Sequence, residues 1–256
     1  MESGHEQNPL LRFSNRVGDY ARYRPGYPPE LIVWLRDAID LRPAWIVADV
    51  GSGTGLLARE FTANGNLVYA VEPNPEMRTA AEAAFEREPH FASMAGSAEA
   101  TGLPAGCVDL VSAGQAFHWF DRDAVQREWR RILCPGGRVL IVFNSRRIGA
   151  TPFMGAYDRF LVERAVDYPG VDHRRVLGES LSSFFDGMQE WHHHFFQPQT
   201  WEELLGVAMS SSYVPAPGHP RHAAFVEGLK VLFDEHAINS HVEFAYETEA
   251  YTGWLA

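Results

Sequence analysis

Three alternating glycines stand between an apolar run and a helix-like segment. Gly51, Gly53 and Gly55 follow the near-continuous apolar run 45–50, and the apolar positions of 56–61 come after them. Glycine lets a chain bend sharply and lets a ligand lie against bare main chain. A buried strand, a glycine-rich turn and a helix in this order are typical of a site that binds a nucleotide or nucleoside.

An acidic residue follows at the distance that such a site needs. Glu72 comes 21 residues after Gly51 and directly follows the next apolar run, 67–71. A carboxylate at the end of that strand can accept hydrogen bonds from both hydroxyls of a ribose. A glycine-rich turn without any ligand is the simpler alternative, and the acid at this spacing makes it much less plausible.

Residues that are missing from the loop argue against a dinucleotide and against a nucleotide phosphate as the ligand. A dinucleotide fingerprint requires glycine where this chain has Leu56, and a phosphate-binding loop requires a lysine that is missing here. Asp49 stands two residues before the loop. Because like charges repel, its carboxylate suits a cationic amino-acid group better than a pyrophosphate.

The elements that must position this loop alternate between strand and helix. Continuous apolar runs predict buried strands, and residues with helical spacing lie between them. This rhythm predicts an α/β fold with a doubly wound, mostly parallel sheet, whose ligands bind beyond the carboxyl ends of the strands. The strands are expected at 45–50, 67–71, 91–95, 108–113 and 139–143, and the helices at 30–41, 56–65, 75–85 and 123–133, with a tight turn at 135–137.

The rhythm changes after residue 144. Helical spacing at 154–166 predicts an insertion over the sheet, and a sixth strand is expected at 191–196. Helices at 200–209, with Thr200 as N-cap, and 220–236 follow, and alternating residues predict a last strand at 242–251.

Several motifs together resemble one enzyme family. Residues 49–55 (Asp-Val-Gly-Ser-Gly-Thr-Gly) and 71–77 (Val-Glu-Pro-Asn-Pro-Glu-Met) resemble the first two motifs of class I S-adenosylmethionine-dependent methyltransferases, as do 96–99 and 131–137 for later ones. Segments 23–28 and 117–120 resemble the type 11 subgroup, which includes trans-aconitate methyltransferase-like enzymes. The match is good over 45–145, and the last third agrees only in length and rhythm.

The resemblance implies a fold and its parts. It implies a Rossmann-like sheet of seven strands in a single domain, 1–256. The expected parts are an N-terminal lid (1–29), a donor-binding core (30–148), a helical cap (149–187) and the C-terminal part of the sheet (188–256).

The resemblance also implies a site for S-adenosylmethionine, with S-adenosylhomocysteine as product. Asp49 would face the amino group of the donor, Glu72 would hold its ribose, and Arg24 could pair with its carboxylate. The full set of implied donor-binding residues is Arg24, Asp49, Gly51, Ser52, Gly53, Glu72, Pro73, Asn74, Met77, Ser97, Ala98, Glu99 and Gln115.

Residues after the fourth strand point to the acceptor side. His118 could act as a general base on an acidic O–H or N–H of the acceptor, and the alternative is a structural imidazole. Aromatic residues could surround the acceptor and the sulfonium, or could instead be core under a lid. The expected substrate-binding residues are Tyr20, Tyr23, Trp119 and Tyr157.

We therefore predict methyl transfer to a small-molecule acceptor, with a carboxylate or phenolic oxygen favoured over nitrogen or carbon. Two alternatives stay open at this stage: an NAD-dependent oxidoreductase with an unusual loop, and a non-catalytic module that binds S-adenosylmethionine. Binding of NADH would identify the first, and donor binding without turnover the second.

Composition limits the partners. With 22 Lys+Arg against 33 Asp+Glu, the net charge is −11, which disfavours a nucleic-acid partner. No apolar run approaches the ~18 residues that span a membrane, and the N-terminus has no signal-peptide pattern. Two cysteines, Cys107 and Cys134, suggest free thiols in a cytoplasmic protein. His192 and His194 share a strand face, but two ligands do not close a metal site, so no metal is predicted.

Overall fold

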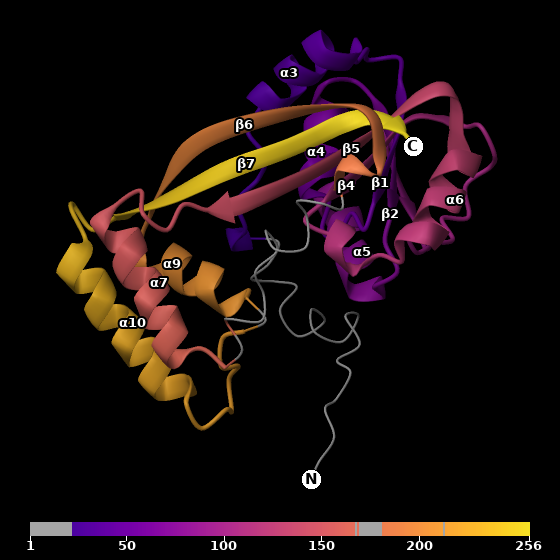
Figure 1. Cartoon of the computed structure of the whole chain (residues 1–256). Coiled ribbons are helices and arrows are strands. Elements are labelled where there is room, and N and C mark those ends of the chain that lie inside the picture. The colour runs from indigo at the N-terminus through magenta and orange to yellow at the C-terminus, as the bar shows by residue number, and fades with distance from the viewer. Residues whose placement is uncertain (1–21, 167, 169–180, 212) are drawn as a thin grey trace.

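One twisted sheet organises the molecule (Figure 1). The computed structural model describes residues 22–166, 168, 181–211 and 213–256. The strand order is β3-β2-β1-β4-β5-β7-β6. The strands are β1 (Ile46–Val50), β2 (Leu67–Val71), β3 (Phe91–Met94), β4 (Val108–Gly114), β5 (Leu133–Arg146), β6 (Phe185–Gln199) and β7 (Val242–Leu255).

The pairing of the strands confirms the predicted fold class. β1 lies between β2 and β4 and is parallel to both, and β4 is parallel to β5. Only β7 runs against its neighbours, β5 and β6. The sheet is therefore mostly parallel, and the carboxyl ends of β1, β2, β4 and β5 meet at one edge.

Helices cover both faces of the sheet. Phe61 of α4 and Leu35 of α3 pack with Val47 on one face, and Trp129 of α6 packs with Val111 and Phe143 on the other. Among the described residues the helices are α3 (Glu30–Ile39), α4 (Leu56–Ala63), α5 (Pro75–Ala84), α6 (Arg122–Ile132), α7 (Pro152–Arg164), α9 (Trp201–Met209) and α10 (His222–His236), with a short 3-10 helix η1 (Phe117–Trp119).

The predicted tight turn at 135–137 is wrong in detail. β5 begins at Leu133, and its register with β4 shifts between the pairs Val108–Leu133 and Leu110–Arg138. The Pro-Gly-Gly segment is thus a bulge within a longer strand. β6 and β7 are also longer than predicted, because they pair with each other over most of their length.

A third hydrophobic cluster lies at one end of the β6–β7 pair, under α7, α9 and α10 (Figure 1). Phe244 of β7 packs there with Tyr157 of α7, at a ring distance of 5.4 Å. Thr200 caps α9 in a capping box with Glu203, which confirms the predicted N-cap. The helical layer thus includes α9 and α10 as well as α7, a helix of the predicted cap. In the part of the chain that the structure describes, no helix has the length and apolarity to cross a bilayer.

Candidate functional site

The glycine loop has backbone conformations that residues with a side chain rarely adopt. Gly51, Gly53 and Gly55 have φ values of +65°, +58° and +85°, so each lies in the left-handed region. A Cβ at Gly51 would approach the Cβ of Ala116 to 2.8 Å, whereas a Cβ at Gly53 would meet no atom within 4 Å. The space beside Gly53 is therefore open, as a ligand cradle requires.

This difference predicts a selective effect of the substitution Gly53→Ala. We expect a loss of stability of about 1 kcal/mol, from the positive φ alone, because no protein atom is in the way. We also expect at least a roughly tenfold loss of affinity for S-adenosylhomocysteine, because the new methyl group enters the cradle. Thermal melting and calorimetric titration of the same preparation measure the two effects, and wild-type affinity in this variant would remove Gly53 from the cradle.

Glu72 is held in place by the main chain on both sides. One carboxylate oxygen accepts a hydrogen bond from the Gly53 N–H (2.9 Å) and the other from the Asn74 N–H (2.9 Å). The side chain is only 8% exposed, and burial raises its pKa, while these two hydrogen bonds oppose the shift. Each oxygen keeps a second lone pair, so the acid can accept two further hydrogen bonds from a diol.

Asn74 and Met77, two of the residues expected to flank an adenine, lie at the start of α5. The Asn74 side chain accepts a hydrogen bond from the Met77 N–H (3.0 Å), which caps the helix, and Met77 is buried. Ala98 is also buried, and Glu99 accepts a hydrogen bond from the Asp121 N–H (3.2 Å). The remaining members of the implied set lie in the connecting turns: Ser52 donates its N–H to the Val71 carbonyl, Pro73 accepts from Arg78, and Ser97 pairs with Ala100.

Asp49 lies buried under the loop with one oxygen uncommitted. Its Oδ1 accepts a hydrogen bond from the Ser112 hydroxyl (2.9 Å), and its Oδ2 accepts no hydrogen bond of ordinary geometry from the residues that the structure describes. The Ala58 N–H at the start of α4 lies near enough to favour the charged form, yet burial dominates and raises the pKa of Asp49 to about 7. A cation placed at Oδ2 would compensate this charge.

Gln115 stands at the end of β4 in an unusual conformation. Its φ is +58°, which is uncommon for a residue with a side chain and frequent at functional positions. Its amide donates a hydrogen bond to the Asn144 carbonyl at the end of β5 (2.7 Å). Asn144 in turn donates to the Gly26 carbonyl (2.9 Å), so the described part of the predicted lid is tied to this edge of the sheet.

His118 lies in η1, directly after β4. Its ring is 4.7 Å from the ring of Trp119 and 6.5 Å from that of Phe143. Trp119 is 41% exposed, so it can contact a ligand that approaches from solvent. The position agrees with a residue beside the reacting group, and its role as a base stays a prediction.

Three further predicted site residues, Tyr23, Arg24 and Tyr157, contact or belong to the helices α7 and α9. Arg24 donates a hydrogen bond to the Ser210 carbonyl (3.4 Å) after α9, and the Tyr23 hydroxyl donates to Glu202 (3.0 Å). Tyr157 is buried in α7 at 1% exposed. Tyr20 lies outside the described residues.

Sequence analysis missed Arg146, the last residue of β5. Its guanidinium lies 5.5, 5.3 and 5.7 Å from the rings of Tyr157, Tyr168 and Tyr213. It donates a hydrogen bond to the Tyr168 hydroxyl (3.2 Å), and it forms no ion pair with a carboxylate among the described residues. Burial raises the pKa of Tyr168, so its hydroxyl is neutral, and it donates in turn to the Asp158 carboxylate, which therefore reaches the guanidinium only through this tyrosine. No local motif marks this arginine, because its partners come from distant segments.

The three consecutive histidines 192–194 lie beside acidic residues that are distant from them in the sequence. His192 Nδ1 and His194 Nε2 lie 3.1 and 3.2 Å from the same Glu247 oxygen. Ligand atoms of His192, Glu247 and Glu249 all lie within 4.8 Å of one another on the outer face of β6 and β7. The face is partly exposed, and the prediction that it holds no metal stays a prediction.

Comparison with known proteins identifies the family. Residues 48–141 match the model of a methyltransferase domain. An uncharacterized methyltransferase of Mycobacterium tuberculosis is 36% identical over 214 residues, which cover 82% of this chain and 81% of that protein. The chain belongs to the methyltransferase family. An uncharacterized methyltransferase of Schizosaccharomyces pombe is 33% identical over 135 residues, or 52% of this chain and 53% of that protein.

A solved structure agrees with this fold. A putative type II methyltransferase from Anaeromyxobacter dehalogenans has a TM-score of 0.67 and 24% identity, and the match covers 91% of this chain and 98% of that one. The resemblance to class I S-adenosylmethionine-dependent methyltransferases of type 11 is thereby confirmed, and the chain is an enzyme that uses this donor. The alternative of an NAD-dependent oxidoreductase is set aside.

The residues present fit the donor. Gly53 borders open space, Asp49 has an uncommitted buried oxygen, and Glu72 has lone pairs to spare. The open space lets an adenosyl amino acid lie against bare main chain. The Asp49 oxygen suits its ammonium group, and the Glu72 lone pairs suit its ribose hydroxyls.

Proposed function

We propose that this methyltransferase transfers the methyl group to an oxygen of a small molecule, and that this oxygen carries negative charge, as a carboxylate or an ionised phenol does. The observation that carries the proposal is Arg146. A guanidinium with no direct carboxylate partner among the described residues, beside tyrosines at the end of β5, favours an anionic group beside it. That the acceptor is a small molecule is a prediction from the resemblance. That it is met in the cytoplasm, and that no nucleic acid or membrane takes part, are predictions from composition.

The chain's own residues bind and align the reactants. Glu72 would hold the ribose, Asp49 the ammonium, and Asn74 with Met77 the edge of the adenine. S-adenosylmethionine, when bound, supplies a methyl group on a sulfonium that is already activated for displacement. The remaining task is alignment, which can supply ~7–11 kcal/mol of the barrier. Gln115 and Asn144 link the donor edge to the strand that carries Arg146.

The proposal is tested with a labelled methyl donor and a panel of small carboxylic acids and phenols. A methyl ester releases labelled methanol in alkali, whereas a phenol ether or an N-methyl group does not. We expect turnover with a member of the panel and label in an ester or an ether. Label found only on nitrogen, carbon, protein or nucleic acid would overturn the proposed acceptor.

His118→Ala tests whether a base assists the reaction. A general base contributes roughly 10²–10⁴-fold, so we expect kcat to fall at least tenfold if the acceptor must lose a proton. An acceptor that is already ionised needs no base, and kcat would then be unchanged at a pH above the pKa of the acceptor. The pH–rate profiles of the variant and the wild type separate the two cases, and an effect on KM alone would reassign His118 to binding.

A further inference from the structure

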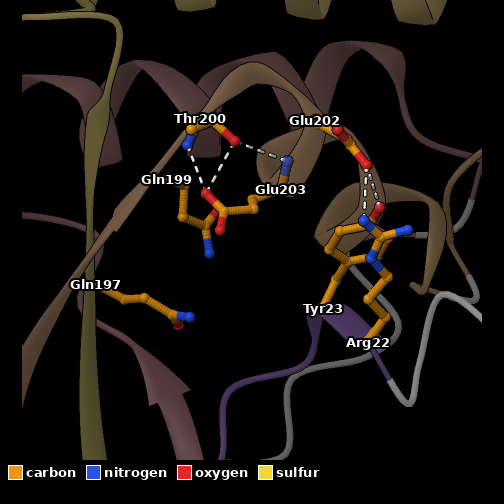
Figure 2. A pocket seen from close by; sticks show the side chains of 7 residues that line it. All are labelled: Arg22, Tyr23, Gln197, Gln199, Thr200, Glu202 and Glu203. Atoms are coloured by element: carbon orange, nitrogen blue, oxygen red, sulfur yellow. Dashed lines mark hydrogen bonds and ion pairs between the residues drawn. The ribbon is translucent and has the colours of Figure 1, made fainter.

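A polar cavity of about 200 Å³ lies between β6, α9 and the segment that carries Arg22 and Tyr23 (Figure 2). At ~30 Å³ for each water of the bulk liquid, this is room for about six or seven waters, or for a group the size of a monosaccharide. The residues that line it are Arg22, Tyr23, Gln197, Gln199, Thr200, Glu202 and Glu203.

The charged residues of this cavity already have partners. Glu202 accepts hydrogen bonds from Arg22 and from Tyr23, both at 3.0 Å. Glu203 accepts from the N–H (2.8 Å) and the hydroxyl (2.9 Å) of Thr200 in the capping box. These groups shape the rim, and their hydrogen bonds leave the recognition of a ligand to the two glutamines.

Three amide atoms of the two glutamines are buried and accept or donate no hydrogen bond of ordinary geometry among the described residues. Gln199 is 1% exposed, and both its oxygen and its nitrogen are in this state. The side-chain oxygen of Gln197 is likewise buried and unpaired. Figure 2 shows both side chains pointing into the space below α9. Burial raises the pKa of Tyr246, so this tyrosine stays neutral; its hydroxyl lies near the Gln199 amide, whose smaller effect is to lower that pKa.

Buried amide groups in this state require a ligand or ordered water. The uncommitted atoms are two acceptors and one donor, and the oxygen and nitrogen of an amide can be exchanged by a flip. A hydroxyl group both donates and accepts, so a hydroxylated ligand satisfies the glutamines in either orientation. A carboxylate cannot, because it only accepts.

The sheet connects this cavity with the donor edge. Gln197 pairs with Phe244 and Asn144 pairs with Thr248, and these β7 residues lie on one face of the sheet, four residues apart. At 3.3–3.4 Å per residue the two rows are about 13 Å apart along the strands. Tyr246 lies halfway between them and pairs with Arg146.

We propose that the cavity between β6 and α9 binds a hydroxylated group, of polyol or monosaccharide type, at the far end of the methyl acceptor, and that Gln197 and Gln199 recognise it. This rests on the proposed function, since the cavity takes its occupant from the acceptor whose reacting oxygen lies near Arg146. The acceptor is then an elongated molecule whose hydroxylated end lies about 13 Å from the donor edge.

The test uses saturation-transfer NMR of the full chain with glucose, myo-inositol and glycerol as probes at millimolar concentration. We expect transfer to at least one probe in the wild type and a loss of at least about tenfold in Gln199→Leu. The matched control is Gln189→Leu, which changes an exposed glutamine of the same strand, and it should keep the signal. Because the Gln199 amide is unpaired, the melting temperature of Gln199→Leu should be unchanged or higher. If that variant unfolds, Gln197→Leu gives the same test from the neighbouring position.

Titration with S-adenosylhomocysteine separates this proposal from the proposed function. Donor affinity should be the same in Gln199→Leu and in the wild type. Absence of transfer to all three probes in a protein that binds S-adenosylhomocysteine would overturn the cavity proposal alone. Equal transfer in Gln199→Leu and wild type would also overturn it. Loss of donor binding in the wild type would instead contradict the donor site itself.

Discussion

Substitution of Glu72 by alanine is expected to weaken the binding of S-adenosylhomocysteine by at least about 100-fold. A hydrogen bond to a charged group contributes about 1.5–3 kcal/mol, and the ribose would make two of them. Their loss amounts to roughly 3–6 kcal/mol, and each 1.4 kcal/mol is a factor of ten in affinity. Calorimetric titration of both proteins at one pH measures the change.

Two further variants control this result. Glu72→Gln keeps one carbonyl oxygen and should lose less affinity than the alanine variant. Glu82→Ala removes an exposed acid from α5 and should leave the affinity unchanged. The Gly53 and Asn74 N–H groups lose their acceptor in Glu72→Ala, so a thermal melt must show that the variant is folded before its affinity is compared. Unchanged affinity in folded Glu72→Ala would remove this residue from the site.

Donor affinity is expected to fall about tenfold for each pH unit below pH 7. The pKa of Asp49 is raised to about 7 in the ligand-free protein by burial, so the group is mostly protonated at pH 6. The ammonium of the donor favours the charged carboxylate, and binding must therefore release a proton. Above pH 7 Asp49 has already lost its proton in the free protein, so donor affinity no longer changes with pH through this group.

Asp49→Asn is the matched variant because it keeps the shape and loses the titration. Its affinity should be lower at pH 8 and should not change between pH 6 and 7. Calorimetric titrations at pH 6 in two buffers of different ionisation enthalpy measure the number of protons released for each donor molecule bound. We expect a number near one for the wild type and near zero for the variant. Equal proton release in both proteins would show that another group titrates and that Asp49 does not face the ammonium.

The same pKa shift has a consequence for stability without ligand. The folded pKa lies above the unfolded one, so the folded state binds more protons between about pH 4 and pH 7. The contribution of Asp49 to stability is therefore most favourable in acid and declines as the pH rises to 7. Saturating donor should cancel this trend, because its affinity rises with pH through the same group.

The donor half of the site could be predicted from sequence because its determinants are local. The glycines at 51, 53 and 55 need left-handed backbone, and Glu72 ends the strand that pairs beside β1. The family and the parallel core followed from the same short segments.

The acceptor half could not be predicted in this way. Arg146 meets Tyr246 only because β5 pairs with β7, a contact between residues 100 positions apart. Gln199 is buried beneath α9, although only the N-cap and the first residues of that helix are its neighbours in the sequence. Periodicity identifies β6 and β7 as strands, but it does not give their register, and the register decides which side chains share a face.

A crystal structure of the protein with S-adenosylhomocysteine tests the central claim most directly. The account predicts an adenosyl group over the loop 51–55, with both ribose hydroxyls within hydrogen-bond distance of the Glu72 carboxylate and the ammonium at Asp49. Density for the ligand at any other place, or an empty loop at a ligand concentration far above the measured Kd, would contradict it.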